Sequence, residues 1–133
     1  MIGTIDAVRR ELSEGGLVRR YQTNETDDGV KGGEGLFIAC SFWLVDALYA
    51  AGQQRDAVSL FEQLLRLRND VGLLSEEWDP AAQRQLGNTP QAFSHFALVI
   101  SALQLHSGTA ARSDHPMQTA GPLSDAAIYH DEQ

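Results

Sequence analysis

The segment from Leu36 to Ala51 reads LFIACSFWLVDALYAA, and it decides the class of fold. Its pattern is apolar nearly all round a helix, and it closes at Gly52, a residue that favours the end of a helix. A helix without a polar face has to be covered on most sides by other elements. The segment therefore predicts an inner helix of an all-α protein, with Trp43 in the core.

The segments on either side of this helix have a different pattern. Residues 4–14 carry Ile5, Val8 and Leu12 at helical spacing, and Gly15-Gly16 ends the pattern. Residues 54–68 place apolar side chains on one side of a helix and charged side chains on the other. Both segments predict outer helices, each with one face in solvent.

A fourth helix is predicted near the C-terminus. Thr89 provides an N-cap and Pro90 the first helical position, and QAFSHFALVISALQL then runs almost continuously apolar to about residue 106. This pattern indicates a second inner helix. Residues 107–133 are rich in Gly, Pro, Ser and Asp without periodicity, so we expect a mostly disordered tail after a folded region of residues 1–106.

The predicted order is outer, inner, outer, inner, and the connections between the helices differ in length. The connection at Gly52-Gln53 is very short, whereas residues 15–34 and 69–88 form long connections of the kind often kept for function. In antiparallel hairpins both long connections emerge at the same end. We therefore expect their carboxylates, arginines and aromatic residues to meet at the N-termini of the two inner helices, where a polar ligand could bind.

Composition excludes several classes of function. The formal net charge of −8 and the scattered basic pairs make nucleic acid a poor partner. No apolar run approaches the roughly 20 residues of a membrane span, and the N-terminus lacks a secretory signal, so we expect a cytoplasmic protein. The single cysteine, Cys40, lies in an apolar pattern and is interpreted as a buried thiol. No metal-binding or phosphate-binding motif is present, so no cofactor is implied.

The second long connection contains LLSEEWDP, residues 73–80, with three carboxylates beside a tryptophan. Glycosidic cleavage requires a pair of carboxyl groups, and an indole can provide an apolar platform for a sugar ring. An acidic cluster in a loop is, however, more often only solvated. The residues alone therefore leave both interpretations open.

Residues 33–105, in particular GEGLFIACSFWLVDAL, LFEQLLRLRNDVGLLSEEWDP and QLGNTPQAFSHFALVISALQL, resemble the C-terminal part of bacterial glycoside hydrolase family 15. This family contains glucoamylases and trehalase-like glycosidases. The resemblance implies an (α/α)6 toroid of six helical hairpins, of which this chain would provide about the last two. It also implies an inverting hydrolase that acts on α-glucosidic bonds of an oligosaccharide or disaccharide.

The resemblance also implies roles for particular residues. The general base of the family is the first acidic residue of an S-E-[EQ]-aromatic-D motif, which corresponds to Glu76. Glu77 occupies the neighbouring position, which contacts the water or the sugar in relatives. Arg20-Tyr21 matches an arginine-aromatic pair that holds the sugar at the cleavage point, and Trp78 is assigned to substrate binding with them.

Part of the family pattern is missing from this sequence. The general acid of the family lies upstream, in a barrel segment that the chain does not contain, so we expect a fragment or split subunit that is inactive without the remaining hairpins. We also expect inner helices that two hairpins cannot cover to favour self-association. His95 and Asp46 are interpreted as supporting residues that form hydrogen bonds.

Two other hypotheses remain open at this stage. Helical hairpins also form α-solenoids that bind protein partners without catalysis. Solenoids have a recurring sequence period, whereas the two long connections share no repeat. The sequence could also be a reading frame without an independent role.

Overall fold

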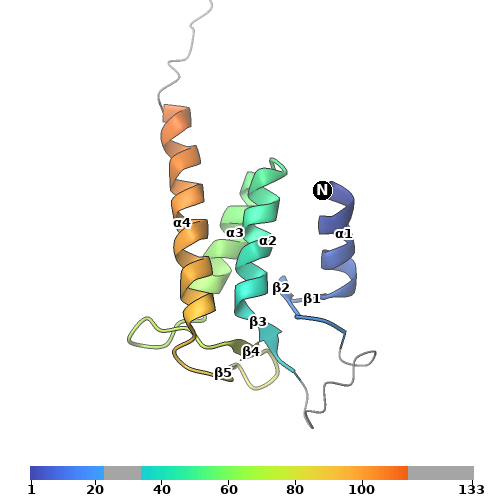
Figure 1. Cartoon of the computed structure of the whole chain (residues 1–133), viewed down its shortest axis with the longest axis vertical. Coiled ribbons are helices and arrows are strands. Elements are labelled where there is room, and N and C mark those ends of the chain that lie inside the picture. Colours follow the sequence, from blue (N-terminus) through green and yellow to red (C-terminus); the bar gives the residue numbers. More distant parts are fainter. Residues whose placement is uncertain (23–33, 114–133) are drawn as a thin grey trace, which may run out of the picture.

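The computed structural model describes residues 1–22 and 34–113. In these residues the chain forms four helices in the predicted order (Figure 1). Their bounds are Ile2–Glu11 for α1, Ile38–Ala50 for α2, Gln54–Leu65 for α3 and Ala92–Ser113 for α4. Figure 1 shows α2 between α1 and α4, with α3 behind it.

The prediction of an all-α fold is only partly correct, because short strands lie between the helices. Strands β1 (Ser13–Glu14) and β2 (Leu17–Val18) form an antiparallel hairpin. A second antiparallel sheet has the order β3-β4-β5, with bounds Leu36–Phe37, Glu77–Asp79 and Arg84–Leu86. Residues 77–79, which we interpreted as part of a loop, thus form the central strand of a sheet.

The core is built around α2, as the apolar pattern predicts. Phe42 and Val45 are fully buried, and α3 contributes Ala57 and Leu64, which are also fully buried. The outer position of α3 is confirmed, because its charged residues remain exposed. Trp43 was predicted in the core, but its side chain is 56% exposed.

Hydrogen bonds of polar side chains attach α2 to neighbouring elements. The Ser41 hydroxyl accepts a hydrogen bond from the Val18 backbone N–H at 2.9 Å. On the side facing α4, the Ser101 hydroxyl donates to Asp46 Oδ1 at 2.6 Å, which agrees with the predicted supporting role of Asp46. Partial burial raises the pKa of Asp46, while the bond from Ser101 opposes this shift.

Helix α4 differs from its predicted bounds at both ends. It begins at Ala92 rather than Pro90, and the Gln91 backbone N–H just before it donates to Leu74 O at 3.0 Å. It continues to Ser113, past the expected end near residue 106. The rest of the predicted tail, residues 114–133, lies outside the described residues. None of the described helices is long and apolar enough to cross a membrane.

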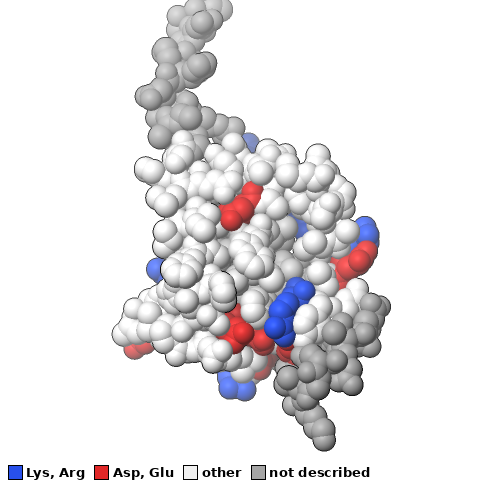
Figure 2. All heavy atoms as spheres, in the orientation of Figure 1, with Lys and Arg blue, Asp and Glu red and all other residues white. Residues whose placement is uncertain are grey.

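One face of α4 is apolar but has no covering element among the described residues. Large side chains on this face are between 51% and 65% exposed: Phe93, Phe96, Val99, Ile100 and Leu103. Their spacing places them on a single stripe of the helix. Figure 2 shows that the surface over α4 and α2 is largely uncharged on the side in view. We refer to these five residues as the α4 apolar face.

Candidate active site

The pairing of β3 with β4 brings the two long connections together at one end of the molecule. Leu36 lies opposite Trp78, and Phe37 lies opposite Glu77. The backbone N–H of Ile38, the first residue of α2, donates to Glu76 O at 3.1 Å. Figure 2 shows acidic and basic side chains gathered at the end of the molecule where this sheet lies in Figure 1. The predicted meeting of the two connections is thus confirmed for their described residues, whereas residues 23–33 of the first connection lie outside the described residues.

Glu76 immediately precedes β4, and Asn88 holds it in place. The side-chain amide Nδ2 of Asn88 donates to Glu76 Oε2 at 3.0 Å, and the Asn88 backbone N–H donates to the same oxygen at 3.3 Å. The Glu76 backbone N–H donates in return to Asn88 O at 3.0 Å. The carboxylate is thus attached to the segment that follows β5.

Glu77 has a different environment, although it is the next residue. Its Oε2 accepts a hydrogen bond from the Gly35 backbone N–H at 2.8 Å. Because successive side chains of a strand point to opposite faces, Glu77 and Trp78 lie on opposite sides of β4. Trp78 is half-buried and packs against the core, so only part of its ring is open to a ligand.

Arg20 and Tyr21 form a cluster with Glu34. Arg20 donates hydrogen bonds to Glu34 Oε1 and to the Tyr21 hydroxyl, and that hydroxyl donates to Glu34 Oε1 at 2.9 Å. The Arg20 guanidinium carbon also lies 4.7 Å from the centre of the Tyr21 ring and 5.4 Å from that of Phe37. The hydrogen bond from Arg20 to Glu34 raises the pKa of the arginine.

The sequence did not predict a role for Glu34. Its side chain is only 14% exposed, and its Oε2 is buried without a hydrogen-bond partner among the described residues. The neighbouring Gly35 donates a hydrogen bond to Glu77, so the chain at Glu34 links Arg20 and Tyr21 to β4. The only sequence feature that could have indicated Glu34 is its place as an acidic residue next to a glycine at the start of an apolar run.

His95 supports the segment before Glu76, as predicted. The Leu74 backbone N–H donates to His95 Nε2 at 3.3 Å, so Nε2 carries no proton and Nδ1 donates to Gln91 O at 2.7 Å. Beside it, the buried Ser94 hydroxyl donates to Ser75 O at 2.7 Å. The first turns of α4 therefore fix the chain on which Glu76 lies.

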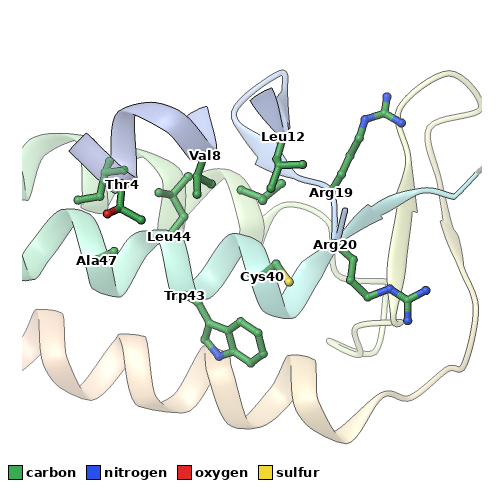
Figure 3. Close-up of a pocket in the computed structure, with 11 residues that line it drawn as sticks. Thr4, Val8, Leu12, Arg19, Arg20, Cys40, Trp43, Leu44 and Ala47 are labelled. Carbon is green, nitrogen blue, oxygen red and sulfur yellow. The ribbon is translucent and has the colours of Figure 1, made fainter. Parts of the chain in front are cut away.

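Two hollows lie beside this arrangement. A cavity of about 270 Å³ between α1 and α2 has mostly apolar walls; Figure 3 shows Val8 on the α1 side near Leu44 of α2. Cys40 also lines it, and burial raises the pKa of its thiol. A second hollow of about 320 Å³ is lined by Glu34 and Asp79 among others. Neither hollow includes Glu76.

The model of the glycosyl hydrolases family 15 matches residues 1–103, which include both long connections and all of this site. The chain belongs to glycosyl hydrolase family 15. This membership confirms the resemblance noted in the sequence, and it favours a glycosidase over an α-solenoid.

Three similar proteins illustrate the relationship to family members. The trehalases of Mycobacterium tuberculosis and Mycolicibacterium smegmatis are each 50% identical over 96 residues, which cover 72% of this chain and 14% of the relative. The trehalase of Thermoplasma volcanium is 37% identical over 105 residues, covering 78% of this chain and 16% of the relative. The chain thus spans about one-seventh of the length of the mycobacterial relatives. No solved structure matches the chain significantly.

Because Gly35 lies close to β4, a larger residue at this position should destabilise the fold. A Cβ at this position would lie 2.8 Å from Trp78 O and 3.1 Å from Glu77 Cβ. We expect Gly35→Ala to lower the free energy of unfolding by about 1–3 kcal/mol, the usual cost of overpacking, in urea denaturation. Gly3→Ala is the matched control, because nothing lies within 4 Å of its added Cβ and alanine favours the helix. A Gly35→Ala chain as stable as the wild type would contradict the close packing of the two segments.

Proposed function

We propose that the chain is the C-terminal part of an inverting glycoside hydrolase that acts on α-glucosidic bonds. Glu76 is its general base. The observation that carries the proposal is the family match over residues 1–103, which covers the SEEWD motif at residues 75–79. We infer the role of Glu76 from the resemblance of this motif to that of the family. The separate environments of Glu76 and Glu77 support different roles for the two carboxylates.

In the proposed mechanism, a water molecule lies between Glu76 and the anomeric carbon of the substrate. The carboxylate accepts a proton from this water as its oxygen forms a bond to the carbon, and the glycosidic bond breaks on the opposite face. The leaving oxygen takes a proton from a general acid, so the product sugar has inverted configuration. Because the chain spans only 14% of its mycobacterial relatives, we assign the acid to another part of the enzyme.

The other predicted residues position the substrate in this proposal. Arg20 and Tyr21 contact the sugar, and Glu34 and the aromatic stacking restrict the guanidinium of Arg20. Glu77 contacts the sugar or the water, and the open part of Trp78 packs against a sugar ring. Trehalose is the first substrate to test, because the similar proteins are called trehalases, and maltose is the second.

We further propose that the α4 apolar face packs against the remaining helices of the enzyme. Burying one large apolar side chain contributes about 1.5–3 kcal/mol, and this face presents five of them. In the absence of those helices, the same face favours self-association of the chain.

Substitution of the two glutamates tests the mechanism in a complete enzyme. We would fuse this chain to the M. smegmatis trehalase in place of its matching segment and follow the hydrolysis of trehalose and maltose. We expect Glu76→Gln to lower kcat by about 10²–10⁴-fold with little change in KM, because it removes the base and preserves the shape.

Glu77→Gln is the matched control, and its effect should be much smaller. If the two effects were exchanged, the base would be Glu77. An active fusion that neither substitution slows would contradict a catalytic role for this segment.

A charge on the α4 apolar face tests the packing proposal. We expect the wild-type chain to self-associate with rising concentration in sedimentation experiments, and Phe96→Glu to reduce this association because it places a charge in the apolar stripe. Val58→Glu on α3 is the control, since Val58 is 42% exposed and lies on a different helix. Equal association of all three chains would contradict the role of this face.

A further inference from the structure

We propose that Asn88 is a positioning residue that holds one oxygen of Glu76 and reserves the other, Oε1, for proton transfer. This inference rests on the proposed function and assigns the base to a single atom. Its basis is the set of contacts that surround the carboxylate.

Asn88 binds Glu76 through three hydrogen bonds. Two of them, from the side-chain Nδ2 and the backbone N–H, end on Oε2 at 3.0 and 3.3 Å. The third joins the Glu76 backbone N–H to Asn88 O at 3.0 Å and keeps the two residues in register. Since the same residue holds both the backbone and the carboxylate, the side chain of Glu76 has little freedom to turn away.

The backbone of Gly87 lies close to the Glu76 carboxylate, on the side of Oε2. An added Cβ at Gly87 would lie 2.9 Å from Glu76 Oε2 and 3.0 Å from Glu76 Cβ, and its φ of +70° favours glycine. Oε2 is therefore enclosed between this backbone and the Asn88 amide.

Oε1 has the opposite environment. No hydrogen bond to it is formed within residues 1–22 and 34–113, and it is not among the buried polar atoms there that lack a partner. A carboxylate oxygen with open lone pairs can accept a proton from water, whereas two donors already occupy Oε2. The geometry thus assigns proton transfer to Oε1.

The assignment also explains why glutamine is the informative substitution at position 76. Its carbonyl oxygen can replace Oε2 as the acceptor of both Asn88 donors. Its amide nitrogen then occupies the place of Oε1, where it carries two hydrogens and cannot accept a proton. Glu76→Gln should therefore preserve the position of the side chain while removing the base.

The test uses two substitutions at position 88 and one matched control. Asn88→Ala removes the side-chain donor, and Asn88→Asp keeps its size but replaces the donor with an oxygen. Asn69→Ala is the control, because Asn69 lies in the same connection and its side chain accepts hydrogen bonds from Val71 and Leu73 rather than contacting Glu76.

Two measurements on these chains are combined. In the full chain, three-bond carbon couplings should show one Glu76 rotamer for the wild type and Asn69→Ala, and averaged rotamers for Asn88→Ala. In the fusion enzyme, kcat should fall about 10- to 100-fold for both Asn88 variants, as expected for a misplaced catalytic group, with little change in KM.

The outcomes separate this inference from the proposed function. A single Glu76 rotamer in Asn88→Ala, or averaged rotamers with an unchanged kcat, would overturn the positioning role. A fusion enzyme that hydrolyses neither sugar, combined with averaged rotamers in Asn88→Ala, would overturn the proposed function and retain the positioning of Glu76 by Asn88.

Discussion

The antiparallel pairing between β3 and β4 is the constraint on which the rest of the site depends. It places Phe37 opposite Glu77 and leads directly into the hydrogen bond from the Ile38 N–H to Glu76 O. Because Ile38 begins α2, the most buried helix fixes the position of the Glu76 backbone. Gly35 permits this approach, since a side chain there would collide with β4.

The same sheet separates neighbouring charges. Glu76 is bound to Asn88 on one segment, while Glu77 is bound to Gly35 on the other. Arg20 lies close to Glu34, which balances its charge and restricts its motion. Each of these three carboxylates thus accepts at least one hydrogen bond from another segment of the chain. This arrangement leaves one side of Glu76 open to solvent.

The sequence predicted the helices well, because apolar periodicity reports directly on which faces are buried. It also predicted that both long connections meet at one end, and that His95 supports the segment before Glu76. It failed for the strands: segments of two or three residues are too short for an alternating pattern to be recognised. Trp43 was misplaced for another reason, since apolar neighbours in sequence do not reveal which helices are available to cover it. The role of Asn88 depends on a contact across twelve positions of the chain, which no local motif encodes.

Membership of glycosyl hydrolase family 15 and the exposed α4 apolar face together support the view that this chain acts as part of a larger enzyme. The central claim is that Glu76 activates the attacking water. A crystal structure of the fusion enzyme with a non-hydrolysable trehalose analogue tests it most directly. The account predicts a water about 2.6–3.2 Å from Glu76 Oε1, on the face of the sugar opposite the leaving oxygen. A water held there by Glu77, or by no carboxylate of this chain, would contradict it.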